Sequence, residues 1–127
     1  MILFPDVETN LVSLLQSAFP TIRVATKKAP ANEQPSQQIV LSVSYASENP
    51  ATPVLRYAGV VLDVYGDDYA TVSTTARQVV ARLRNAVGAN IKKVSIVSGP
   101  TRMGDDTGQE HRAISAEIVV KATDYNP

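Results

Sequence analysis

His111 is the only histidine among the 127 residues, so any acid-base or metal chemistry based on imidazole depends on it. Together with a serine and an aspartate it could form a catalytic triad. The sequence contains no G-x-S-x-G turn to present a nucleophilic serine, and a single histidine excludes the H-E-x-x-H zinc site. We therefore expect His111 to be a surface or interface residue. On the same grounds we expect no catalytic residue, no metal site and no enzymatic activity.

A second candidate for chemistry is an acidic cluster near the C-terminal end. Asp105, Asp106 and Glu110 fall within six residues and could hold a hard cation through their oxygen atoms. Their spacing does not match a calcium loop, and paired carboxylates do acid-base work only where burial separates their pKa values. Because the segment is rich in glycine, we expect a solvated polar loop.

The glycine spacing and the absence of cysteine narrow the chemistry further. Gly99, Gly104 and Gly108 do not fit G-x-G-x-x-G, and there is no phosphate-binding G-x-x-x-x-G-K-[ST] motif. With no cysteine in the chain, disulfides, thiolate metal clusters and thiol nucleophiles are excluded. We expect no cofactor.

The charges are balanced in total but segregated along the chain. Twelve Lys and Arg residues oppose twelve Asp and Glu residues, which argues against general nucleic-acid binding. From Tyr69 to Gly104, however, the sequence has six basic residues and no acidic one, and the acidic cluster follows. One interpretation is a solvated helix surface whose arginines favour the C-terminal end; a DNA-contacting patch is another. A third is that the basic stretch of one subunit meets the acidic loop of the next in a head-to-tail ring. The six basic residues are Arg77, Arg82, Arg84, Lys92, Lys93 and Arg102.

The elements that must position these residues are separated by prolines, which interrupt helices and central strands. Apolar residues at three- and four-residue spacing predict two helices, and alternating or continuous apolar runs predict five strands, the third of them central. The predicted helices are 6–19 and 68–87, the strands are 21–26, 38–46, 54–65, 93–98 and 111–123, and loops cover 27–37 and 99–109.

The order α-β-β-β-α-β-β predicts an α+β two-layer sandwich with a mainly antiparallel sheet and both helices on one face. A chain of this length, with 44% hydrophobic and 19% charged residues, predicts one folded domain over residues 1–127. The other sheet face is only partly apolar, and we expect that face or the sheet edges to serve association.

No part of the sequence predicts a membrane segment. The apolar start, residues 1–4, is interrupted by Pro5 and Asp6 and is too short for a signal-peptide core. No run approaches the roughly 18 apolar residues of a membrane span. We expect no membrane partner.

Three stretches together resemble a known family. The first is the helix end Ala18-Phe19-Pro20, followed by residues 23–26 and a proline-bearing loop. The second is residues 59–68, which lead into an Ala- and Arg-rich helix. The third is Ser98-Gly99-Pro100, followed by the acidic loop and a last strand carrying Arg112. In the order of elements and in these turns, most of the chain resembles the tail terminator, or tail completion, proteins of long-tailed, siphovirus-type phages.

This resemblance implies a non-enzymatic α+β subunit that forms a ring, typically a hexamer, on the last ring of the tail tube. There it would stop tube polymerisation and present a surface to the neck or head-completion protein. Genomic DNA would pass through the lumen without sequence-specific binding. The protein would be made in the host cytoplasm and would reside in the virion, at the head-proximal end of the tail.

By the same resemblance, subunit and tube contacts would lie in the loops 27–37, 47–53 and 99–109. The residues expected at subunit or tube interfaces, from this resemblance and from the charge pattern, are Lys27, Lys28, Arg77, Arg84, Arg102, Met103, Asp105, Asp106 and Arg112.

Two alternatives stay open. The chain could be a head-completion or neck connector protein, which the sequence separates poorly from a tail terminator. It could also be a small α+β ligand-binding or hydrolytic domain unrelated to virions. The last alternative requires a pocket that brings His111 together with a carboxylate.

Overall fold

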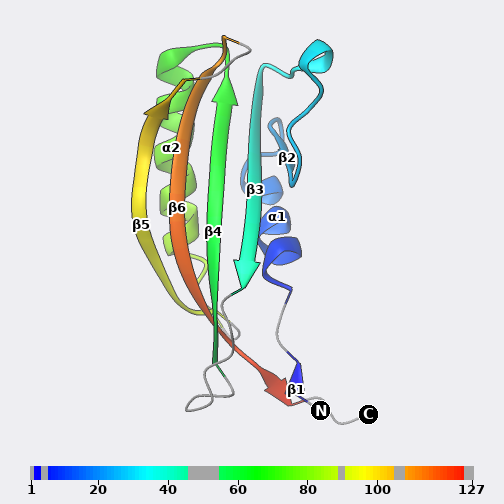
Figure 1. Cartoon of the computed structure of the whole chain (residues 1–127), viewed down its shortest axis with the longest axis vertical. Helices are drawn as coiled ribbons and strands as arrows, with labels where there is room; N and C mark the ends of the chain where they lie inside the picture. The colour runs from blue at the N-terminus through cyan, green and yellow to red at the C-terminus, as the bar shows by residue number, and fades with distance from the viewer. Residues whose placement is uncertain (1, 4–5, 46–54, 89–90, 105–107, 125–127) are drawn as a thin grey trace.

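The computed structural model describes residues 2–3, 6–45, 55–88, 91–104 and 108–124. A five-stranded sheet forms one layer and two helices form the other, so the expected α+β sandwich is confirmed (Figure 1). The strand order is β2-β3-β4-β6-β5. The main elements are α1 (Val7–Ala18), β2 (Arg23–Ala25), β3 (Gln37–Tyr45), β4 (Leu55–Gly66), α2 (Tyr69–Arg84), β5 (Ile91–Met103) and β6 (Glu110–Lys121).

Each helix begins at an aspartate that caps its first turn. Asp6 accepts a hydrogen bond from the Thr9 amide at 3.1 Å, and Asp68 accepts one from the Thr71 amide at 2.9 Å. These bonds satisfy amides that have no partner within the helix. The hydroxyl and then the amide of Thr71 lower the pKa of Asp68, and the amide and then the hydroxyl of Thr9 lower the pKa of Asp6. The predicted helices are confirmed, with ends a few residues shorter than expected.

The sheet is antiparallel except for the parallel pair β2 and β3. Since side chains alternate along a strand, one face carries the apolar set that the helices cover. The inner-face residues at 0 or 1% exposure are Ile39, Leu41, Ala58, Val60, Leu62, Val64, Ile114, Ile118 and Val120. β4 lies between β3 and β6 along most of its length, which confirms the predicted central strand.

The opposite sheet face, called the open face below, carries no helix (Figure 1). The register places Ser42 beside Val61 and Val61 beside Ser115, so small and hydroxyl side chains alternate with aliphatic ones there. Val61 is 42% exposed and Tyr57 is 36% exposed. The expectation of a partly apolar second face is confirmed.

The end of β5 differs from the expected strand and loop. Residues 99–103 were expected in a loop, but β5 continues through them to Met103, and Pro100 does not mark a gap. A proline is tolerated because β5 is an edge strand, where one side of the backbone needs no partner. Three register shifts interrupt its pairing with β6, two of them flanking Ser98.

Two short strands were not expected. β1 (Ile2–Leu3) pairs antiparallel with β7 (Thr123–Asp124) in a separate two-stranded sheet. Two residues are too few to show an alternating pattern, so the sequence carries no signal for them. The expected strand 21–26 is confirmed only over β2, and the expected strand 111–123 ends at Lys121.

The segment 27–36, predicted as loop, folds over one end of the open face and includes a 3-10 turn, η1 (Ala31–Glu33). Gln38 of β3 is fully buried beneath this segment. Its Oε1 accepts hydrogen bonds from the Ala29 amide at 3.0 Å and from Arg23 Nη1 at 3.1 Å, and its Nε2 donates to Gln34 Oε1 at 2.7 Å. Gln38 therefore fixes the path of this loop.

We expect Gly99→Ala to destabilise the protein by about 3 kcal/mol. Gly99 has a φ of +93°, and a Cβ there would collide with the carbonyl oxygen of Ala113. The free energy of unfolding in urea measures the loss. The control is Gly104→Ala, where a Cβ meets nothing within 4 Å, and its effect should stay within about 0.5 kcal/mol. Equal stability of the two variants would contradict the prediction.

We expect Gln38→Ala to lower the free energy of unfolding by about 2 to 3 kcal/mol, because the buried Ala29 amide loses its acceptor. Trypsin should also cleave faster at Lys27 and Lys28 in this variant, since the loop loses its anchor. Ser42→Ala, on the exposed side of the same strand, is the control. An unchanged cleavage rate would show that Gln38 does not hold the loop.

Candidate functional site

The residues expected at interfaces do not form one site. Arg102, Met103 and Arg112 come together where β5 ends and β6 begins, because Arg102 lies opposite Arg112 in the sheet register and Met103 opposite His111. Lys28 lies over the open face, Lys27 is exposed on its loop, and Arg77 and Arg84 are exposed on α2. Asp105 and Asp106, and the predicted loop 47–53, lie outside the described residues.

Arg102 and Arg112 share one carboxylate. Arg102 donates from Nη2 to Glu110 Oε1 at 2.8 Å and from Nε to Glu110 Oε2 at 3.2 Å, and Arg112 Nη1 donates to Oε2 at 3.1 Å. Both guanidinium groups lie over the ring of Tyr69, at 4.9 and 4.8 Å from its centroid. The hydrogen bonds from Arg102, and then those from Arg112, lower the pKa of Glu110, so this carboxylate is ionised at neutral pH.

This pairing changes the role expected for two arginines. The side chain of Arg112 is 6% exposed, and its charge is compensated inside the subunit. The side chain of Arg102 is 62% exposed, yet it too is bound to Glu110. Neither Glu110 nor Tyr69 was predicted from the sequence as a partner of these arginines. The strand register would have indicated Glu110, because two arginines facing each other across neighbouring strands need a carboxylate between them.

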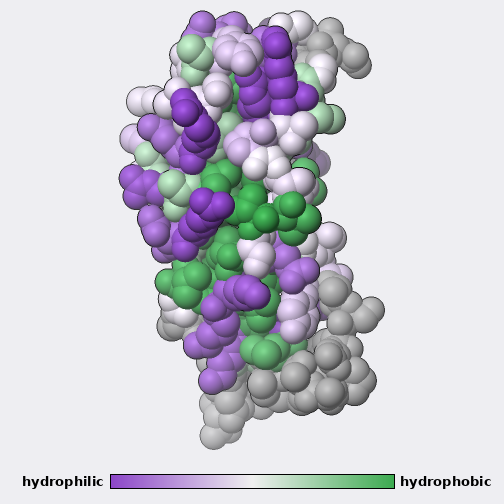
Figure 2. Space-filling model, turned by 90° about the vertical axis from the view of Figure 1, so that its left-hand side faces the viewer, coloured by the Kyte–Doolittle hydropathy of each residue, from purple (hydrophilic) through white to green (hydrophobic). Residues whose placement is uncertain are grey.

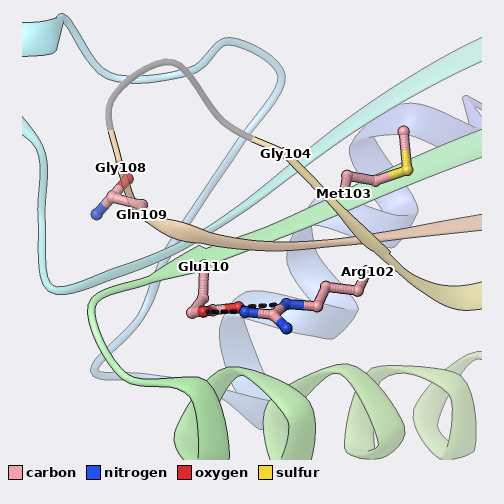
Figure 3. Close-up of a pocket in the computed structure, with 6 residues that line it drawn as sticks. All are labelled: Arg102, Met103, Gly104, Gly108, Gln109 and Glu110. Carbon is pink, nitrogen blue, oxygen red and sulfur yellow. Dashed lines mark hydrogen bonds and ion pairs between the residues drawn. The ribbon is translucent and has the colours of Figure 1, made fainter.

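An open depression of about 380 Å³ lies beside this ion pair. Figure 3 shows the Arg102 and Glu110 side chains meeting across it, while Met103 points away from the pair. At the same end of the sheet, Gln109 Nε2 donates to the Pro35 carbonyl and to Asp67 Oδ1, both at 3.2 Å. These bonds tie the start of β6 to the tip of β4 and to the loop before β3.

A second polar cluster lies on the open face. His111 Nε2 is 2.6 Å from Asp63 Oδ1, and the imidazole stacks on Tyr65 with ring centroids 4.3 Å apart. Lys28 Nζ lies 4.3 Å from the centroid of the Tyr65 ring. Neither Asp63 nor Tyr65 was predicted from the sequence as a partner of His111. The register indicates both, since Tyr65 lies directly opposite His111 and Asp63 is opposite Ala113.

This cluster brings His111 to a carboxylate, as the hydrolytic alternative requires, but it lacks the rest of a catalytic arrangement. A histidine base needs its second nitrogen to reach a hydroxyl or a substrate. His111 Nδ1 is buried, and among the described residues it has no hydrogen-bond partner. None of the cavities described for this chain is lined by His111 or Asp63. The geometry supports a packed polar cluster.

The arginines of α2 divide between two sides of the helix. Arg82 lines a groove of about 380 Å³ between the helices, together with Ala18 of α1 and Ala81 of α2. Arg77 and Arg84 are two helical turns apart and lie on the other side, next to Val80 and toward β5. Within the described part of the chain, these three arginines have no ion-pair partner.

The described residues were also searched for a metal site and for a helix that could span a membrane. In the ranges that the structure describes, no group of three His, Cys, Asp or Glu side chains could hold a metal ion. Neither α1 nor α2 is long and apolar enough to cross a membrane.

Comparison with protein-family models and with curated protein sequences gives no match for this chain.

We expect Glu110→Gln to lower the melting temperature at pH 7 and to lose this effect in acid. Arg102 and Arg112 lower the pKa of Glu110 from its usual 4.5, so its stabilising contribution is fully present above pH 4.5. The contribution is lost as the pH falls through the lowered pKa of the folded state. Calorimetry of both proteins from about pH 7 to pH 2 measures this. Glu117→Gln, an exposed change on the open face, is the control. A difference that does not depend on pH would contradict the assignment.

Proposed function

We propose that this protein is a structural virion subunit, a tail terminator of a long-tailed phage. It would assemble as a ring, cap the head-proximal end of the tail tube, stop tube polymerisation and bind the neck or head-completion protein. It would have no enzymatic activity and no cofactor, and DNA would pass through the ring without sequence-specific contacts. It would be made in the host cytoplasm and reside in the virion.

The one-sided sandwich is the observation that carries this proposal. Both helices cover the same face of the sheet, and the open face presents exposed Tyr57 and Val61 beside small hydroxyl residues. A surface that combines exposed apolar residues with small polar ones is suited to contact with another protein. The order of elements also agrees with the resemblance noted in the sequence.

The polar clusters support a structural role more than a catalytic one. Arg102 and Arg112 are hydrogen-bonded to Glu110, and His111 is hydrogen-bonded to Asp63. These contacts join parts of the same subunit. The His111–Asp63 contact is the one feature that favours the alternative of a hydrolytic domain. If that alternative holds, His111→Ala should abolish a hydrolytic activity that the wild-type protein possesses.

Tube capping tests the proposal directly. We expect purified protein at high concentration to form a closed ring, with native mass giving the subunit number and negative-stain images showing a central hole. Added to polymerising tail tube protein of the same phage, the ring should bind tube ends and halt elongation. A protein that stays monomeric and leaves tube length unchanged would refute the proposal.

Binding to portal protein distinguishes a tail terminator from a head-completion or neck connector protein. A head-completion protein should bind purified portal and ignore tubes, whereas a terminator should bind tube ends without portal. A ring that binds only portal would replace the terminator proposal with the neck connector.

A further inference from the structure

The two helices carry opposite charges. α1 and its cap contain Asp6 and Glu8 and no basic residue, whereas α2 and its cap contain three arginines and one acidic residue, Asp68. The helices also lie toward opposite edges of the sheet. α1 packs against β2 and β3, and α2 packs against β4, β6 and the edge strand β5 (Figure 1). The helical layer is therefore acidic toward one edge and basic toward the other.

The basic side is a mixed surface, which we call the β5–α2 edge. Arg77 and Arg84 flank Val80 on the side of α2 toward β5, and β5 adds exposed Lys92 and Val97 beside half-buried Val94 and Ile96. Val97 is 67% exposed, the largest value among the exposed large hydrophobic residues of the described chain. Figure 2 looks onto this side of the molecule and shows hydrophobic residues between hydrophilic ones. The β5–α2 edge consists of Arg77, Arg84, Lys92, Val94, Ile96 and Val97.

The three cations of this edge are all exposed to solvent. Over the described residues, none of the three has an ion-pair partner within the chain. A partner that covers this whole edge would bury Val97 together with Arg84 and Lys92, and burying cations without counter-ions is costly. The occupant of this surface therefore needs apolar groups with carboxylates beside them.

The opposite side of the same molecule offers this combination, and we call it the α1 edge. Val12 lies one turn before Gln16 and Glu8 one turn before Val12, so this side of α1 carries all three, with a rotation of about 40° at each step. Gln16 Oε1 accepts a hydrogen bond from the Val24 amide of β2 at 3.3 Å, which turns this side toward the sheet edge. Tyr45 lies at the start of α1, where its hydroxyl accepts a hydrogen bond from the Val7 amide at 3.3 Å. The α1 edge consists of Asp6, Glu8, Val12 and Tyr45.

The two edges lie at the same level of the sheet. Tyr45 pairs with Ala58, Ala58 pairs with Ile118, and Ile118 pairs with Val94, so Tyr45 and Val94 end one row across four strands. Two copies placed side by side in the same orientation would bring the α1 edge of one against the β5–α2 edge of the other. Asp6 and Glu8 would then face Arg84 and Lys92, and Tyr45, whose ring carries the Arg56 guanidinium at 4.5 Å from its centroid, would approach Val94.

We infer that a second copy of this chain occupies the β5–α2 edge through its α1 edge. This inference rests on the proposed function, because it names the contact through which the ring would close. The contact joins two different surfaces, so each subunit can bind one neighbour on each side, and the chain of contacts closes if the rotation between subunits allows it. The α1 edge supplies carboxylates from within the described residues, in place of the acidic loop that begins at Asp105.

The chain contains no cysteine, so cysteines introduced at the two edges would be the only thiols available for cross-linking. In the double variant Glu8→Cys with Arg84→Cys, a short bismaleimide should link neighbouring subunits into a ladder that extends to the full ring. The matched control is Ser42→Cys with Arg84→Cys, since Ser42 is exposed on the open face and belongs to neither edge. We expect the control to give at most a small fraction of linked dimer.

Charge reversal provides a second measurement on the same contact. Glu8→Lys and Arg84→Glu should each raise the dissociation constant for self-association about tenfold at low salt, and the combined variant should recover part of the loss. Unfolding temperatures of all variants should stay close to that of the wild type, which separates loss of contact from loss of fold.

The outcomes separate this inference from the proposed function. A ring by native mass that gives no ladder with the edge pair, or gives one with the Ser42 control instead, overturns the edge contact and leaves the terminator proposal standing. A wild-type protein that remains monomeric at high concentration and does not cap tubes overturns both. A ladder from the edge pair in a protein that fails to cap tubes supports the contact and refutes the function.

Discussion

The register of β4 between β3 and β6 is the constraint on which the rest of the structure depends. β4 is paired with both neighbours over most of its length, and its inner residues are almost completely buried. Because side chains alternate, this register decides which residues meet the helices and which meet solvent. A slip of one residue would turn Leu62 outward and Asp63 into the core. The same register places Tyr65 opposite His111.

Much of this architecture could be predicted because its signals are local. The helices show a sustained apolar period and an aspartate cap, and β4 is a long apolar run, so their types and approximate ends follow from the chain. The continuation of β5 through Pro100 could not be predicted in this way. A proline excludes a central strand but allows an edge strand, and edge position is a property of the whole sheet.

The polar contacts were harder to predict than the elements, for a related reason. Glu110 is two residues from Arg112 but eight from Arg102, and Asp63 is 48 residues from His111. Only the register of the assembled sheet brings Glu110 to Arg102 and Asp63 to His111. The chain composition revealed that basic and acidic residues are segregated, yet Arg102, counted among the available cations, is bound within its own subunit. The number and spacing of charges can be read from the sequence, whereas the folded structure is needed to know which of them are already paired within the subunit.

The irregular edge strand has a consequence for how copies of the protein can meet. β5 carries Pro100 and three register shifts along its 13 residues, so its outer side cannot offer a neighbouring strand an uninterrupted row of backbone donors and acceptors. Open sheet edges otherwise invite endless strand addition and fibrous aggregation. Copies that meet at β5 would therefore bind through side chains and not through a continuous pairing of strands.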